Sequence, residues 1–304
     1  MQIISGTTEF ELNGDYAVTI GKFDGVHKGH RELIDRILCK PNLKSAVFTF
    51  DKSPLEFFSG KQIPALTTIE EKRRIFSYLG VDTLIEFPLN EVTAKTSPES
   101  FIEDILVKKL HAKYIVAGSD ATFGDKGMGN AKLIADMSAK LLYDYEIIDK
   151  LIIDNEEVSS TLIRDYVKCG NMEKAGELIG VPYAIIGTVI RGNQIGRTIG
   201  FPTINIEVHR SKLMPPFGVY FTEISVDGSH YKGITNVGTK PTVSDDLTVF
   251  AETNILDFNE DIYGKNVTVK LLHFERPERK FESLNELKAQ ISNDMANGRV
   301  YFGQ

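Results

Sequence analysis

The chain of 304 residues is long for one hydrophobic core, which favours an organisation in two domains. Hydrophobic residues make up 42% of it and charged residues 25%, close to the average of folded proteins, so extensive disorder is excluded. The 42 acidic residues outnumber the 35 basic ones and give a formal net charge of -7. This charge disfavours a nucleic-acid partner, because a polyanion would be repelled.

The cysteines and the apolar runs indicate the redox state and the location of the protein. Cys39 and Cys169 lie far apart and lack the close spacing of a zinc or redox pair, so we expect both to be reduced. The start of the chain has no cationic region followed by an apolar run, and no segment approaches the ~20 apolar residues of a membrane helix. We therefore expect a cytoplasmic protein with no membrane partner, and the sequence indicates no oligomeric state.

Short apolar runs alternate with helical stretches from residue 15 to about residue 150. This alternation is typical of βαβ units around a mainly parallel sheet. Thr68 and Glu71 can form a capping box and Gly80 a left-handed C-cap, which marks the two ends of one helix. The predicted strands are 16–20, 45–50, 83–87, 114–117 and 145–148.

The pattern changes in the second half of the chain. Two short helices, 161–168 and 172–179, are expected to close the first domain. Six strand-like runs then predict a small antiparallel barrel, and a helix capped by Ser283 and Glu286 ends the chain. We place the boundary near residue 182, which gives domains 1–182 and 183–304. The predicted barrel strands are 184–190, 203–208, 219–226, 230–236, 249–256 and 267–274.

A glycine turn between the first strand and the first helix predicts a nucleotide-phosphate site. Residues 17–30 read AVTIGKFDGVHKGH, in which His27 and His30 lie three residues apart at the start of the helix. Imidazoles there can donate hydrogen bonds to a transferred phosphoryl group, and the helix N-terminus adds N–H groups. An isolated HxGH could equally be two surface histidines, but open α/β sheets bind nucleotides at this crossing. The glycines that would admit the polyphosphate are Gly21, Gly25 and Gly29.

A second segment offers further phosphate ligands. Ser159, Ser160 and Thr161 stand at a predicted helix start, and Arg164 follows one turn later. Hydroxyls, N–H groups and a guanidinium could therefore converge on phosphate oxygens. The alternative is ordinary N-capping by serine and threonine.

A third segment, residues 187–205, reads GTVIRGNQIGRTIGFPTIN and suits a loop that wraps a nucleotide. Thr203 and Asn205 lie two apart on a strand, so both can offer oxygen ligands to Mg²⁺ shared with ATP phosphates. Alternatively, they are half-buried polar residues after a turn proline. The loop residues that we assign to ATP are Gly187, Gly192, Gly196 and Arg197.

These motifs resemble the prokaryotic bifunctional riboflavin kinase/FAD synthetases. GKFDGVHKGH and VSSTLIRDYVKCGNMEKAGELIG look like that family's nucleotidyltransferase motifs, and GRTIGFPTIN looks like its kinase motif. GVY at 218–220, NVGTKPT at 236–242 and Glu252 ahead of DIYG at 261–264 extend the likeness over nearly the whole chain.

The resemblance implies an α/β Rossmann-like nucleotidyltransferase domain, then a small antiparallel six-stranded β-barrel domain with a C-terminal helix. It implies phosphorylation of riboflavin to FMN and adenylylation of FMN to FAD with release of pyrophosphate, with ATP as co-substrate and Mg²⁺. Glu252 would be the general base toward the riboflavin hydroxyl. Phe23, Asp24 and Asp120 are further assigned to ATP, and Phe50 and Pro54, with Glu252, to the flavin.

Several positions depart from the family pattern: Ser53, Ala121, Ile204, Lys240 and Asn254. Lysine keeps the charge of the usual arginine at position 240 but loses its bidentate fork. Two alternatives therefore remain at this point. One is an FMN adenylyltransferase with an impaired kinase-like barrel, and the other is a non-catalytic flavin or nucleotide sensor.

Overall fold

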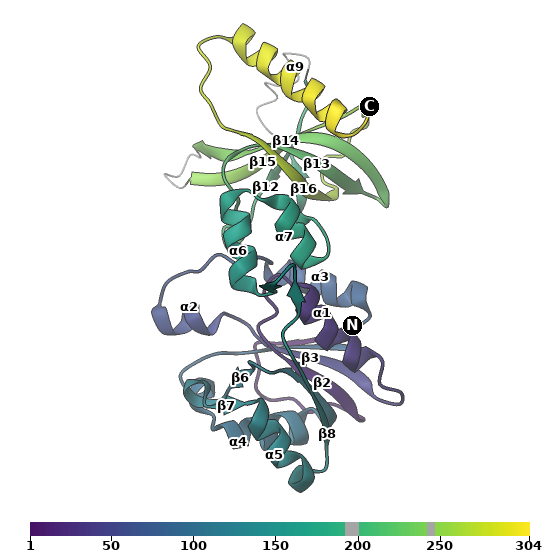
Figure 1. The fold of residues 1–304 in the computed structure, drawn as a ribbon, viewed down its shortest axis with the longest axis vertical. Helices are drawn as coiled ribbons and strands as arrows, with labels where there is room; N and C mark the ends of the chain where they lie inside the picture. The colour runs from purple at the N-terminus through teal and green to yellow at the C-terminus, as the bar shows by residue number, and fades with distance from the viewer. Residues whose placement is uncertain (192–200, 242–246) are drawn as a thin grey trace. The chain divides into compact units, whose positions relative to one another are not determined.

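The computed structural model describes residues 1–191, 201–241 and 247–304 (Figure 1). Contacts divide the chain into two compact units, Met1–Ser160 and Thr161–Gln304. Helices α6 (Ser160–Cys169) and α7 (Met172–Ile179) therefore group mainly with the second unit, although the sequence predicted that they close the first. The functional boundary near residue 182 stays a prediction.

The first unit is built on a six-stranded parallel sheet in the order β1-β4-β3-β2-β5-β8. All five predicted strands are confirmed. The order reverses around β2, which lies between β3 and β5, so the carboxyl ends of these strands flank the crevice where α/β sheets bind ligands. The strands are β1 (Gln2–Ser5), β2 (Tyr16–Ile20), β3 (Lys44–Phe50), β4 (Thr83–Phe87), β5 (Ala112–Gly118) and β8 (Asp144–Ile148).

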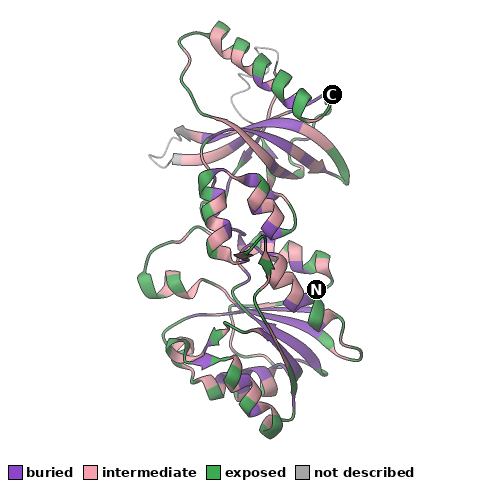
Figure 2. Ribbon diagram, in the orientation of Figure 1, coloured by how far each residue is buried: buried purple, intermediate pink, exposed green. Residues whose placement is uncertain are grey.

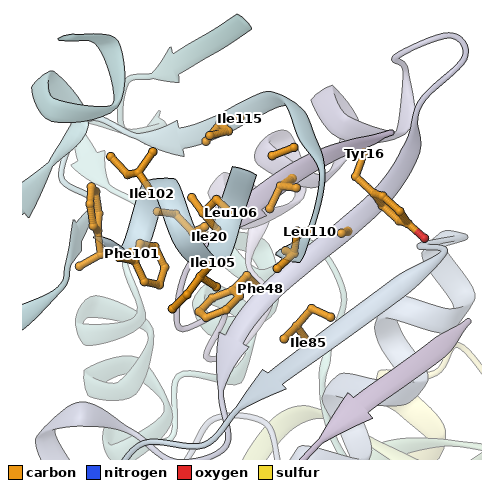
Figure 3. Packing of buried hydrophobic residues seen from close by; sticks show 14 of the residues in the cluster. Tyr16, Ile20, Phe48, Ile85, Phe101, Ile102, Ile105, Leu106, Leu110 and Ile115 are labelled. Carbon is orange, nitrogen blue, oxygen red and sulfur yellow. The ribbon is translucent and has the colours of Figure 1, made fainter. Parts of the chain in front are cut away.

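Helices cover both faces of this sheet, which explains why β2 and β4 are buried along their whole length (Figure 2). On one face, α1 (Lys28–Leu38) and α3 (Ile69–Leu79) pack in a cluster that includes Ile34 and Phe76. On the other, the π-helix η2 (Phe101–Lys109) and α5 (Ala131–Leu141) cover the cluster in which Figure 3 shows Phe48 and Phe101.

The predicted limits of α3 are confirmed in detail. Thr68 and Glu71 make both bonds of a capping box, and Gly80 adopts the left-handed conformation at the C-cap. The remaining elements are short. They are α2 (Pro54–Ser59), η1 (Thr93–Lys95), α4 (Pro98–Ser100), η3 (Asp125–Gly127), β6 (Thr122–Phe123), β7 (Gly129–Asn130), β9 (Ile152–Ile153) and β10 (Glu156–Glu157).

The second unit contains a closed antiparallel barrel in the order β11-β12-β15-β14-β13-β16, as the sequence predicted. Inside it, the Thr235 hydroxyl lies 2.9 Å from that of Thr222 and 2.8 Å from that of Thr253, and all three residues are 0% exposed. This chain of hydroxyls satisfies its own hydrogen bonds and fixes the register of three strands. The strands are β11 (Tyr183–Ile190), β12 (Ile204–Glu207), β13 (Gly218–Val226), β14 (Ser229–Pro241), β15 (Leu247–Ile255) and β16 (Asn266–Pro277).

The C-terminal helix α9 (Leu284–Tyr301) packs against β13 and β14. Its N-cap is Ser283, as predicted, but the Glu286 side chain accepts from the N–H of Glu282 and so does not close a reciprocal capping box. Gly298 allows a close approach, since a Cβ there would lie 2.3 Å from Ile234 Cδ1. In the described part of the chain, the helices are all too short or too polar to span a bilayer.

Candidate active sites

Two stacked histidines stand where the first strand passes into the first helix. His27 is the N-cap of α1, and its Nδ1 accepts a hydrogen bond from the His30 N–H at 3.3 Å. The two rings are nearly parallel, with centroids 3.6 Å apart. Because Nδ1 of His27 is an acceptor, its neutral ring carries the proton on Nε2. Nδ1 of His30 is buried and has no hydrogen-bond partner within the described residues.

Burial keeps both imidazoles uncharged near neutral pH. It lowers the pKa of His27 to about 4, although the carboxylates of Asp24 and Asp120 partly oppose the shift. Burial also places the pKa of His30 well below its usual value, and the charges of His27 and Lys72 act in the same direction. In the free protein both rings are therefore neutral, and they can donate hydrogen bonds without carrying a positive charge.

The glycine turn is held in place by the loop that precedes α3. Gly25 has φ +84°, and its N–H donates to the Thr67 hydroxyl at 3.0 Å. The Asp24 carboxylate accepts from the N–H groups of Leu66 at 2.8 Å and Thr67 at 3.3 Å. Asp24 thus anchors the turn, and its contact with ATP stays a prediction. The contact of Phe23 with ATP also stays a prediction. Its ring is fully buried, with its centroid 5.1 Å from that of the His30 ring, so that only its backbone is available to a nucleotide.

The serine-rich segment reaches this turn through one hydroxyl. Ser160 Oγ donates to the Asp24 carbonyl at 2.8 Å, which ties this residue to the glycine turn; its contact with phosphate stays a prediction. Ser159 precedes it in the first unit. Thr161 and Arg164 follow on α6 in the second unit, so their part in the phosphate site stays a prediction.

A cavity of about 320 Å³ opens beside the histidines. It brings predicted ATP residues, including Gly21, His30 and Asp120, together with the predicted flavin residues Phe50 and Pro54. Its walls are strongly aromatic, which suits a flat ring system next to a phosphate-binding edge. Sequence reasoning missed most of this wall, because all of its members except the exposed Phe58 are buried like ordinary core residues. They are Phe48, Phe58, Phe87, Phe101 and Phe123.

The surroundings of four nearby positions are also defined. Asp120 pairs with Lys150 at 3.2 Å, a cation that the sequence did not single out. Ala121 lines the cavity, so the small side chain there leaves space in the aromatic wall. Ser53 is the N-cap of α2 but makes no capping hydrogen bond. A Cβ at Gly29 would lie 3.4 Å from Nδ1 of the His27 ring.

The barrel aligns a second set of polar residues. Strand register places Asn205 opposite Glu252 on one side and Asn236 opposite Glu252 on the other. Because side chains alternate along a strand, Glu252 and its two partners share the outer face, whereas Ala251 and Thr253 point into the barrel. Asn205 and Glu252, which the sequence assigned separately, therefore lie side by side in the sheet, and Asn236 joins them.

Thr203 lies just before β12, which begins at Ile204, and is two residues away from Asn205. A cavity of about 360 Å³ is lined by Thr203, Pro202, Ile204 and residues 258–263, which include part of the DIYG motif. The Arg191 guanidinium lies 5.3 Å from the centre of the Tyr263 ring at this cavity. Ile204, bulkier than the alanine usual in the family, thus forms part of the cavity wall.

Some predicted residues of this loop cannot be placed. Gly192, Gly196 and Arg197 lie outside the described residues, as does the side chain of Lys240. Gly187 is described, and a Cβ there would lie 2.3 Å from Ile206 Cγ2, so close packing against β12 requires glycine. Its contact with ATP stays a prediction.

The donors on the barrel suit Mg²⁺, which prefers oxygen ligands and commonly shares them with phosphates and water. Thr203 offers a hydroxyl and the buried Asn205 an amide oxygen. Within residues 1–191, 201–241 and 247–304, no group of three or more His, Cys, Asp or Glu side chains could hold a metal by itself. The negative charge that balances a bound Mg²⁺ would thus come mostly from the phosphates of the nucleotide.

Comparisons with known proteins match both halves of the chain. A model of the FAD synthetase family matches residues 9–162, and a model of the riboflavin kinase family matches residues 179–302. A bifunctional riboflavin kinase/FMN adenylyltransferase of Listeria monocytogenes is 37% identical over 303 residues, which are 98% of this chain and 96% of that protein. Its counterpart in Escherichia coli K12 is 37% identical over 291 residues, 94% and 92% of the two chains.

A solved structure extends this likeness to the fold. A crystal structure described as a macrolide-efflux protein from Streptococcus pneumoniae is 31% identical and covers 98% of both chains, with a TM-score of 0.85.

Proposed function

This chain belongs to the family of bifunctional riboflavin kinase/FMN adenylyltransferases, and we propose that it makes FMN from riboflavin and FAD from FMN at two separate sites. The observation that supports this most is that each unit holds its own set of reactive groups. The first has the stacked pair His27 and His30 at a glycine turn beside an aromatic cavity. The second has Glu252 between Asn205 and Asn236 on one face of the barrel.

Adenylyl transfer in the first unit needs positioning more than proton transfer. The FMN phosphate is already anionic near neutral pH, so one of its oxygens can attack the α-phosphorus of ATP without a general base. Pyrophosphate leaves as the new P–O bond forms. Neutral His27 and His30 donate hydrogen bonds to the phosphate oxygens on which charge develops. A positive charge from Arg164 was assigned to this step from the sequence, and that assignment stays a prediction.

Phosphorylation in the second unit needs a base, because the nucleophile is an alcohol. Glu252 takes the proton of the riboflavin 5′-hydroxyl as that oxygen attacks the γ-phosphorus of ATP, and ADP leaves. Thr203 and Asn205 would hold Mg²⁺ through their side-chain oxygens. When bound, the ion neutralises charge on the ATP phosphates.

The remaining requirements follow from these two reactions. ATP, riboflavin and FMN are the small-molecule partners, Mg²⁺ is the required cofactor, and we place the reactions in the cytoplasm. We assign no nucleic-acid or membrane partner.

A product time course tests the proposal. The purified protein is incubated with riboflavin, ATP and Mg²⁺, and the flavins are separated by chromatography. We expect FMN to appear first and FAD to follow as FMN accumulates. Formation of FAD from added FMN but never of FMN from riboflavin would instead support an adenylyltransferase with an impaired barrel. Binding of flavin and ATP without either product would support a sensor.

A further inference from the structure

The segment that enters β12 is held by one side chain of the neighbouring strand. Asn254 Nδ2 donates a hydrogen bond to the carbonyl oxygen of Pro202 at 2.8 Å. Since the acceptor is a carbonyl, the amide group of Asn254 must present its NH₂ on this side. The peptide bond is planar, so a restraint on the Pro202 oxygen also fixes the plane that contains N and Cα of Thr203.

The barrel ladder does not provide this restraint. Pairing between β12 and β15 begins at Ile204, opposite Thr253, so Thr203 lies just beyond the paired strand. Pro202 has no N–H with which to extend the ladder. The hydrogen bond from Asn254 therefore takes the place of one further step of strand pairing.

Asn254 is itself on a rigid strand. Its neighbour Thr253 is fully buried, and its hydroxyl is bonded to Thr235 inside the barrel. Alternation along β15 places Glu252 and Asn254 together on the outer face. The base and the residue that holds the Thr203 peptide thus share one fixed segment of β15.

We propose that Asn254 is a positioning residue that sets the place of Thr203 relative to Glu252 and thereby the affinity of the barrel for Mg-ATP. The inference rests on the proposed kinase function and deepens it. Asn254 would act through the Thr203 backbone, without contacting substrate. If Asn254 had a merely structural role, its loss would lower thermal stability or change the KM values for both substrates alike. Loss of a residue that positions Thr203 should change the KM for Mg-ATP alone.

The test compares two substitutions at this position. Asn254→Leu has a similar shape and no donor. Asn254→His offers Nδ1, which lies as many bonds from Cα as the asparagine Nδ2. For Asn254→Leu we expect the KM for Mg-ATP to rise about five- to ten-fold, in the range of one lost hydrogen bond, with the KM for riboflavin unchanged within about two-fold. The Mg²⁺ concentration that gives half-maximal rate should rise in parallel, and Asn254→His should restore both values.

Asn297→Leu is a matched control, because it removes another asparagine donor, from helix α9 to Glu275 on β16 at 2.8 Å, which makes no hydrogen bond to the segment that holds Thr203. It should leave the KM for Mg-ATP unchanged. Should Asn254→Leu not fold, Asn254→Ser is measured in the same way.

Unchanged Mg-ATP parameters in a folded Asn254→Leu protein would overturn the inference, and so would an equal rise for both substrates that histidine does not reverse. These results are meaningful only beside an active wild type. If the wild type itself fails to phosphorylate riboflavin, the proposed function fails; if it is active and the variant behaves like it, only the role of Asn254 is lost.

Discussion

The buried histidine pair should make the first unit sensitive to mild acid, and His27→Asn should reduce that sensitivity. Asparagine keeps an oxygen that can cap α1, so the helix start is preserved. His27 is 6% exposed, and its pKa falls from 6.5 to about 4 on folding. As pH drops, the unfolded chain binds this proton first, so the stabilising effect of neutral His27 is complete above 6.5 and disappears as pH falls toward 4.

The size of the effect follows from these two pKa values. At about pH 4.5, His27 alone should lower the free energy of unfolding by ~2.5 kcal/mol relative to neutral pH. Urea unfolding followed by far-UV circular dichroism measures this at the two pH values for both proteins. We expect the wild type to lose ~2.5 kcal/mol more than His27→Asn between them. Equal losses in the two proteins would refute the assignment of His27 as a buried neutral group.

Three further substitutions test the sites. Glu252→Gln should lower the rate of riboflavin phosphorylation by about 10²–10⁴-fold and spare FMN adenylylation, measured with each substrate alone; a normal kinase rate would exclude Glu252 as the base. His30→Ala should lower FMN adenylylation by at least about 10²-fold and spare the kinase, and the opposite pattern would contradict the assignment. Gly25→Ala should destabilise the first unit more than Gly80→Ala in calorimetric melting. Both glycines have positive φ, but only the Cβ at Gly25 would meet a neighbour, Leu66 at 3.0 Å. Equal effects would show that this contact is unimportant.

The sheet could be predicted from the sequence because its central strands are apolar along their whole length. β2 and β4 are fully buried, and buried parallel strands appear as continuous apolar runs. β1 escaped prediction because Gln2–Ser5 is short and mostly exposed. In the last helix, Leu284 at the start is exposed, whereas Met295 and the C-cap residue Phe302 pack on the barrel.

The sequence identified the site residues that belong to motifs, but not the properties that depend on burial or on contacts with distant parts of the chain. The spacing of His27 and His30 predicted that they lie together. Their lowered pKa values depend on burial, which a local sequence pattern does not indicate. Asp24 was assigned to ATP from its place in the motif, whereas its hydrogen bonds run to a loop about 40 residues away in the chain. Asn254 was noticed only as a departure from the family pattern, because its partner Pro202 lies 52 residues earlier in the chain, in the segment before β12.

Mixing two variants tests the separation of the two reactions most directly. In the time that the wild type needs to convert riboflavin into FAD, Glu252→Gln alone should form at least about 10²-fold less FAD, and His30→Ala alone should accumulate FMN. Together they should form FAD, because FMN released by the intact barrel of one protein can be adenylylated by the intact first unit of the other. If both variants are folded and each retains its own reaction, yet the mixture still makes no FAD, two independent sites cannot account for the chemistry of this chain.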